Sequence, residues 1–273
     1  MNGTQRTIKH VAIGLGIALA IGIIMGILTL ITSIAWGVGI GRGDDRIVRS
    51  ERVLIQEEIS DIYINIGVSR FEIRTGTEFE VVLNDTEARA EEHNGTLRVT
   101  ENTRRVRFLG FGRNEGQVII YIPEGSTFES VRINSGVGTV NIRSLVANTV
   151  NLSLGVGEVR IDELISNENT RIEGGVGRVV LESGSLRNLS LDSGVGESII
   201  NAELLGSSRL ETGVGRLRLH LMGAMDEYTI RTQSGIGNVT INGTRHSSGT
   251  HGSGANNVQV NGGIGAIEIT TEY

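Results

Sequence analysis

One tripeptide constrains the fold more than any other feature of this chain: Gly-x-Gly with valine or isoleucine in the middle occurs seven times between residues 136 and 265. Successive corners recur at a nearly constant interval, and only the last two intervals are clearly longer. A regular period of this kind indicates stacked structural repeats, each of which packs mainly against its neighbours. The repeated corner glycines are Gly136, Gly138, Gly155, Gly157, Gly175, Gly177, Gly194, Gly196, Gly213, Gly215, Gly235, Gly237, Gly263 and Gly265.

Apolar residues recur at fixed offsets from the first glycine of each corner: five and three residues before it, and one, four and six after it. In the first repeat these residues are Val131, Ile133, Val137, Val140 and Ile142. The seven repeats offer 35 such positions, and only Thr170, Ser198, Ser208 and Thr232 are not aliphatic. This period-two alternation predicts two short strands per repeat, joined at the glycine corner, with the apolar residues forming a continuous core.

The predicted fold class is therefore all-β: a parallel β-solenoid, similar to a β-helix, with coils of about 19 residues stacked about 4.8 Å apart. The glycines suit a positive φ, a bulge, or close backbone contact between coils. A degraded copy of the corner occurs at Gly67-Val68-Ser69. We expect an irregular β capping region over residues 59–129 and the regular repeats over 130–273.

Residues 11–41 contain no ionisable side chain, and a bilayer core needs only about 20 helical residues. We therefore predict one transmembrane helix over 11–41, followed by a juxtamembrane linker over 42–58. The alternative is a cleaved signal peptide, because Ser33-Ile34-Ala35 has the small-x-small pattern of a cleavage site.

The short tail before this segment, residues 1–10, contains Arg6 and Lys9. A single N-terminal anchor after a short basic tail usually exports the domain that follows. We therefore expect a cytoplasmic tail and an extracytoplasmic body, although four arginines just beyond the predicted span favour the opposite orientation. These are Arg42, Arg46, Arg49 and Arg52.

Small residues recur every fourth position in the predicted span, at Gly14, Ala18, Gly22 and Gly26. Such a stripe lets a second membrane helix approach closely, either from another protein or from a second copy of the chain. Glycine is also common in membrane helices in general.

Composition excludes several classes of function. The net charge of −6 disfavours binding to nucleic acid, and the absence of cysteine excludes thiolate metal sites and cysteine nucleophiles. We expect no cofactor and no metal. His246 and His251 could share a metal, but the loop over 244–256 has no cysteine or acidic residue to complete a site, so we interpret it as an exposed loop.

Charged residues at outward positions also follow the repeat. Glu158, Arg178, Glu197 and Arg216 occupy the third position after successive corners, which predicts a ladder of opposite charges between coils. A second row, Glu173, Asp192 and Glu211, could supply the paired carboxylates of a glycoside hydrolase. Because arginines recur two positions before that row, we interpret these residues as neutralised pairs and predict no enzymatic activity.

The segment over 104–113 combines arginine with phenylalanine in an otherwise acidic body. It could bind an anionic cell-wall polymer or lipid headgroups, or it could be a solvated hairpin loop. The candidate ligand-binding residues are Arg104, Arg105, Arg107, Phe108, Phe111 and Arg113.

The repeated S-G-V-G and S-G-I-G corners, at 135–138, 193–196 and 234–237, together with the N-terminal apolar segment, resemble the bacterial putative-adhesin domain family. The likeness covers about residues 59–269. It implies a parallel β-solenoid outside the cytoplasmic membrane, in some relatives alongside envelope-stress systems, and it carries over no catalytic residue. Many relatives have aspartate at the third position of the corner, where this chain has valine or isoleucine.

These observations predict a membrane-anchored, extracytoplasmic, non-enzymatic adhesion or binding module at the bacterial cell envelope. Two alternatives remain from the sequence: a regulatory or scaffolding subunit of an envelope-stress system, recruited through the small-residue stripe, and an enzyme acting on cell-wall polysaccharide.

Overall fold

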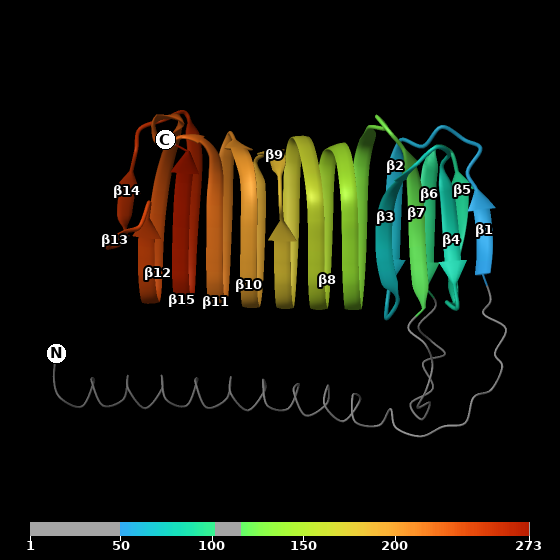
Figure 1. The fold of residues 1–273 in the computed structure, drawn as a ribbon, viewed down its shortest axis with the longest axis horizontal. Coiled ribbons are helices and arrows are strands. Elements are labelled where there is room, and N and C mark those ends of the chain that lie inside the picture. Colours follow the sequence, from blue (N-terminus) through green and yellow to red (C-terminus); the bar gives the residue numbers. More distant parts are fainter. Residues whose placement is uncertain (1–49, 102–115, 273) are drawn as a thin grey trace, which may run out of the picture. The chain divides into compact units, whose positions relative to one another are not determined.

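The computed structural model describes residues 50–101 and 116–272, which form an all-β unit (Figure 1). The predicted transmembrane helix over 11–41 lies outside the described residues. Within 50–101 and 116–272, no helix has the length and apolarity needed to cross a membrane. In chain order the elements are β1 (Ser50–Leu54), β2 (Asp61–Ile66), β3 (Arg70–Gly76), β4 (Glu80–Asn84), β5 (Ala88–His93), β6 (Thr96–Glu101), β7 (Gln117–Pro123), β8 (Phe128–Leu181), β9 (Gly184–Arg187), β10 (Leu189–Leu205), β11 (Ser207–Ala224), a 3₁₀ turn (Met225–Glu227), β12 (Tyr228–Ile241), β13 (Thr244–His246), β14 (Gly249–His251) and β15 (Asn256–Glu272).

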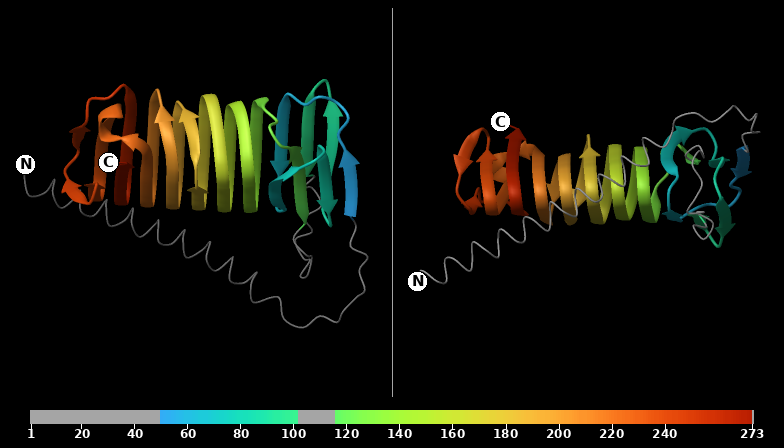
Figure 2. Two further views of the ribbon diagram at one scale, coloured as in Figure 1. Left: turned by 45° about the horizontal axis from the view of Figure 1, so that its top comes forward. Right: turned by 90° about the horizontal axis from the view of Figure 1, so that it is seen from below.

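Successive repeats pair in parallel, as their period predicts. In β10, Val195 lies beside Val176 of β8 on one side and Val214 of β11 on the other. The step from each of these valines to the next equals the regular spacing of the corners in the sequence. The winding of the chain through these stacked strands is visible in Figure 2.

The corner glycines are required for two separate reasons. The second glycine of each corner has a φ near that of Gly196, which is +142°, a conformation that residues with a Cβ rarely adopt. The first glycine packs closely on the coil below: a Cβ on Gly155 would lie 2.2 Å from the carbonyl oxygen of Gly136. Each corner therefore requires glycine at its second position because of the positive φ, and at its first position because of the close approach of the neighbouring coil.

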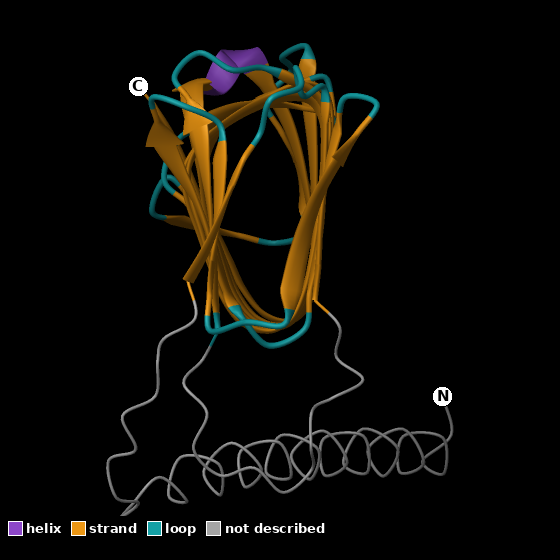
Figure 3. Ribbon diagram, turned by 90° about the vertical axis from the view of Figure 1, so that its right-hand side faces the viewer, coloured by secondary structure: helices purple, strands orange, loops and turns teal. Residues whose placement is uncertain are grey.

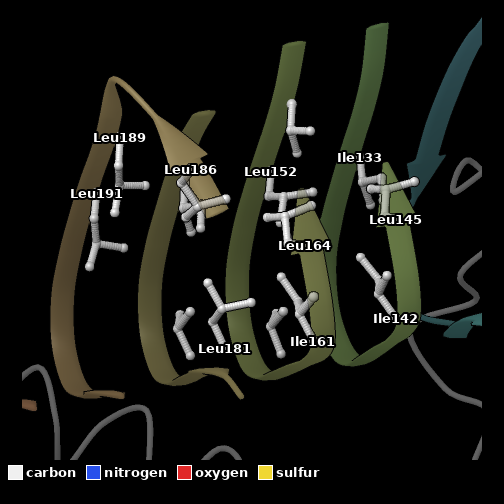
Figure 4. Packing of buried hydrophobic residues seen from close by; sticks show 14 of the residues in the cluster. Ile133, Ile142, Leu145, Leu152, Ile161, Leu164, Leu181, Leu186, Leu189 and Leu191 are labelled. Atoms are coloured by element: carbon white, nitrogen blue, oxygen red, sulfur yellow. The ribbon is translucent and has the colours of Figure 1, made fainter. Parts of the chain in front are cut away.

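The core runs through the middle of the stack (Figure 4). The positions before the corner and at four and six residues after it are mostly buried aliphatics, such as Leu152 and Ile161. The structure adds an apolar stripe that the sequence analysis missed, represented by Leu145, Leu164 and Leu186. It belongs to a third, shorter side of the coil, where β9 pairs in parallel with both β8 and β10.

One part of the predicted core is wrong. The middle residue of the corner faces outward: Val137 is 51% exposed, Ile236 57% and Ile264 43%. The chain bends sharply around the core between two glycines, so the side chain between them lies on the convex side of the bend. Apolar character alone does not distinguish this position from the buried ones.

The four polar residues at predicted core positions are all buried. The hydroxyls of Thr170, Ser198 and Thr232 have no hydrogen-bond partner among the described residues. The hydroxyl of Ser208 differs, because it accepts a hydrogen bond of 3.3 Å from the backbone N–H of Leu189.

We expect Thr170→Val to raise the free energy of unfolding by about 1 kcal/mol, because it removes an unpartnered buried hydroxyl while nearly preserving the side-chain volume. Urea unfolding of the full-length protein in detergent, followed by circular dichroism, measures the change. The control is Ser208→Ala, which removes a hydroxyl that does have a partner and is expected to destabilise the fold. A loss of stability in Thr170→Val would contradict this account.

The two ends of the parallel stack are closed by antiparallel strands. At the C-terminal end β13 and β14 both pair antiparallel with β12, and at the other end β1 pairs antiparallel with β4. These additions occupy backbone groups that would otherwise form open sheet edges. The strand β1 lies within the segment 42–58 that the sequence analysis interprets as a linker.

The order of the coils differs from their order in the sequence. The last strand, β15, lies between β11 and β12 and pairs in parallel with both. Ile264 of β15 therefore sits between Val214 and Ile236, and the β12 coil is the terminal one.

Candidate functional site

The predicted ladder of opposite charges is present on the outer surface. Arg178 lies 3.7 Å from Glu158 and 3.3 Å from Glu197, so one arginine bridges three successive coils. Glu197 also contacts Arg216 at 4.0 Å and Arg218 at 3.0 Å. The ladder stabilises the register of the coils, which is a structural role.

We expect Glu197→Arg to lower the free energy of unfolding by about 1–2 kcal/mol, because it places a cation among three arginines. The loss should shrink in high salt. Asp192→Arg in the same strand makes the same change of charge, but Asp192 lies between Glu173 and Glu211, so it should not destabilise the fold. Thermal unfolding at low and high salt measures both, and equal effects of the two variants would be inconsistent with the ladder.

Two of the three carboxylates considered as a hydrolase site, Glu173 and Glu211, are held in arginine pairs. Arg171 donates to Glu173 at 2.7 Å, and Arg209 donates through its Nε to Glu211 at 2.8 Å. Hydrogen bonds from Asn261 and then from Arg209 lower the pKa of the Glu211 carboxyl. This shift favours the ionised form, whereas a general acid in glycoside hydrolysis needs a raised pKa.

A different site emerges where the capping region meets the regular coils. The pairing of β3 with β8 extends from Phe71 beside Val140 to Ile73 beside Ile142, whereas β3 continues alongside β7 as far as Gly76. A surface hollow of about 520 Å³ lies at this junction. It is lined by Glu72, Ile73, Arg74, Thr75, Asn141, Ile142, Arg143, Arg160 and Asp162; we call it the arginine hollow.

The three arginines of the hollow are not equally engaged. Arg74 donates to Glu72 at 2.8 Å, a bond that raises the pKa of the Arg74 guanidinium. Arg160 contacts Asp162 at 3.5 Å and Glu182 at 2.6 Å. Arg143 is exposed, and it has neither an ion pair nor a side-chain hydrogen bond within the described ranges. The hollow therefore presents one guanidinium with its hydrogen-bonding capacity free.

None of the sequence motifs described above predicted this hollow, although the sequence contains a signal for it. Arg74, Arg143 and Asp162 all lie seven residues after the first glycine of their corner, counting Gly67 as a corner. Aligning the degraded copy with the regular repeats at that offset would have brought the two arginines together.

Two groups of candidate residues from the sequence lie outside the described residues. The candidate ligand-binding group is Arg104, Arg105, Arg107, Phe108, Phe111 and Arg113, and the candidate helix-pairing group is Gly14, Ala18, Gly22 and Gly26. His246 and His251 do come together, with ring centroids 4.5 Å apart. Among the residues the structure describes, however, no three histidine or acidic side chains gather as a metal site would require.

Comparisons with known proteins give one family and several similar structures. A putative cell adhesion protein of Clostridium sporogenes is 14% identical, covering 83% of this chain and 100% of its own, with a TM-score of 0.36. A putative adhesin of Bacteroides fragilis is 10% identical, covering 82% and 98%, with a TM-score of 0.41. A putative lipid binding protein of Parabacteroides distasonis is 12% identical, covering 82% and 97%, with a TM-score of 0.39.

No curated protein matches the chain. The family match is independent of these structures and covers residues 59–260, which include every corner except the last. The β-repeat architecture and this match lead to one conclusion: the chain belongs to the Toastrack DUF4097 family.

Proposed function

We propose that this protein is a membrane-anchored, non-enzymatic binding module of the bacterial cell envelope, whose parallel β-solenoid is displayed outside the membrane. The arginine hollow carries the proposal, because Arg143 is exposed there without a partner among the described residues, beside two further arginines. The apolar run over 11–41 supports the anchor. The exported body follows from the short basic tail that precedes this run.

The ligand class follows from the chemistry of the hollow. A guanidinium binds carboxylate or phosphate through two parallel N–H donors, and Arg143 has these donors available. Asn141 lies within the same hollow and can add a neutral donor. An anionic wall polymer, which repeats a phosphate or carboxylate along its length, fits such a site on a rigid surface.

The binding test uses full-length protein in detergent and two probes, poly(glycerol phosphate) for phosphate groups and polygalacturonate for carboxylates. We expect Arg143→Gln to weaken binding of at least one probe by about 10-fold, since hydrogen bonds to charged groups contribute about 1.5–3 kcal/mol. The matched control is Arg187→Gln, another exposed arginine of the solenoid. Equal affinity of the two variants for both probes would remove the hollow as the binding site.

The anchor and its orientation need a separate test. Alkaline carbonate extraction of bacterial membranes should leave the protein in the membrane fraction, and protease added outside the membrane should digest the body. Release by carbonate would contradict the anchor, and complete protection from protease would contradict the exported orientation.

A further inference from the structure

The outward-facing corner residues form a continuous apolar line along the stack. Exposed fractions reach 57% at Ile236 and are 49% at Val68 and 37% at Val214, whereas Val156, Val176 and Val195 in the middle of the line are half-buried. Eight levels about 4.8 Å apart give this line a length of about 34 Å. In stacking order its members are Val68, Val137, Val156, Val176, Val195, Val214, Ile264 and Ile236; we call it the aliphatic ridge.

The side chains of the ridge are not shielded by their neighbours in the sequence, because glycine flanks nearly every member. The glycines on either side of these residues have no side chain that would shield them. The corners also stack backbone to backbone: from Gly157 onward, a Cβ on the second glycine would lie only 1.6–1.8 Å from the carbonyl oxygen of the neighbouring coil. Apolar side chains exposed singly are ordinary, whereas a contiguous line marks an interaction surface.

The described chain begins on the same side of the coil as the ridge. Ser50 lies opposite Asn84, Asn84 opposite Gln117, and Gln117 beside Arg70. Arg70 is only two residues from Val68 of the ridge. Because these residues form one row across four neighbouring strands, the N-terminal end of β1 lies near the corner edge. Figure 3 looks along the stack and shows the strands running between the two edges of the coil.

Chain length keeps this edge close to the membrane. Only residues 42–49 separate the predicted span from Ser50, and eight fully extended residues reach at most about 28 Å. The opposite side of each coil lies a full strand further from Ser50, whereas the corner edge is the part nearest the point of attachment.

We propose that the aliphatic ridge rests on the bilayer that holds residues 11–41, with its valine and isoleucine side chains inserted at the boundary between headgroups and acyl chains. This inference rests on the anchor of the proposed function and adds the surface through which the body contacts lipid. The solenoid then lies along the membrane, and its third side faces away from it.

The charged residues beside the ridge do not favour binding to anionic lipid, so we expect the apolar side chains to drive the contact with the bilayer. Three residues after the first glycine, the ladder alternates Glu158, Arg178, Glu197 and Arg216, so its charges cancel. On the other flank, Glu173 and Glu211 are neutralised by Arg171 and Arg209, and the neighbouring Asp192 is acidic, so this row does not attract anionic lipid. We therefore expect insertion into zwitterionic phosphatidylcholine, without strengthening by anionic lipid.

The absence of cysteine allows single labels to report which side meets the lipid. Full-length Val137→Cys and Ile264→Cys variants place a nitrobenzoxadiazole label at two levels of the ridge. Glu168→Cys is the matched control, because Glu168 is exposed and follows the third side of the coil. Each protein is reconstituted into phosphatidylcholine vesicles with and without lipid carrying a shallow doxyl quencher, and vesicle flotation is recorded on the same samples.

We expect both ridge labels to be quenched at least about 3-fold more strongly than the Glu168 label, and unchanged when part of the phosphatidylcholine is replaced by anionic phosphatidylglycerol. Equal quenching at the three positions in floating vesicles would overturn the ridge contact while leaving the anchor intact. Failure to float would overturn the anchor and the ridge contact together. Self-quenching between ridge labels that grows with protein density, without quenching by doxyl lipid, would assign the ridge to contacts between copies and overturn the bilayer contact.

Discussion

Gly196→Ala is expected to lower the free energy of unfolding by about 3–5 kcal/mol, enough to unfold much of the regular stack. A Cβ at this position would lie 1.8 Å from the carbonyl oxygen of Gly177 and 2.8 Å from its carbonyl carbon. That backbone is fixed by the parallel pairing of β10 with β8, so it cannot move aside without breaking the ladder. The φ of +142° adds strain of about 1–3 kcal/mol for a residue with a Cβ, and overpacking adds a similar amount.

The matched control is Gly125→Ala, because Gly125 also has a positive φ, of +81°, but a Cβ there would meet nothing within 4 Å. Its expected cost is about 1 kcal/mol, from backbone strain alone. Urea unfolding of both full-length variants in detergent, followed by circular dichroism, separates the two contributions. Similar costs at the two positions would show that the contact between coils contributes little.

Deleting residues 258–273 is expected to remove the order of β12 as well as that of β15. In the structure β15 is the parallel partner of β12 and separates it from β11. The Thr271 N–H of β15 also donates at 3.0 Å to the side chain of Asn242, the residue that follows β12. We expect hydrogen-exchange protection of β12 amides to fall by more than about 100-fold, or about 2.7 kcal/mol of local stability.

The amides of β10 are the control in the same hydrogen-exchange measurement. Because β10 lies away from the deletion, its amides should remain protected. Coils stacked in sequence order would give the opposite result: β12 would then lie directly on β11, and the deletion would leave its protection unchanged. Retained protection in β12 would therefore refute the inserted position of β15.

The repeat pattern predicted much of this fold because each of its signals has a local cause. Alternating apolar residues indicate strands, and the nearly constant interval between corners indicates parallel neighbours in register, as found for β10 and β11. The charge ladder at Glu158, Arg178 and Glu197 follows from the same register, since residues at equal offsets become neighbours. The four polar residues at core offsets are buried as the pattern requires, even where their hydroxyls lack partners among the described residues.

Other features could not be read from the pattern. Val137 and Val131 have similar side chains and both fit the alternation, yet one is exposed and the other buried, because only the sharp bend between two glycines decides which side faces out. The third stripe lacks a constant spacing from the corner across repeats, since Leu164 lies nine residues after Gly155 and Leu186 lies eleven after Gly175. The arginine hollow forms where β3 and β8 stop pairing, and no single repeat contains that junction.

By itself the sequence determined what one coil is: its length, its glycine corner, most of its buried positions and its parallel register. Only the tertiary structure decided which coil lies beside which. The corners at Gly213, Gly235 and Gly263 share the same Gly-x-Gly pattern, so the pattern alone does not assign their neighbours. The choice depends on the ends of the stack: β13 and β14 occupy the free edge of β12, which makes β12 a terminal coil and leaves β15 to fill the place between β11 and β12.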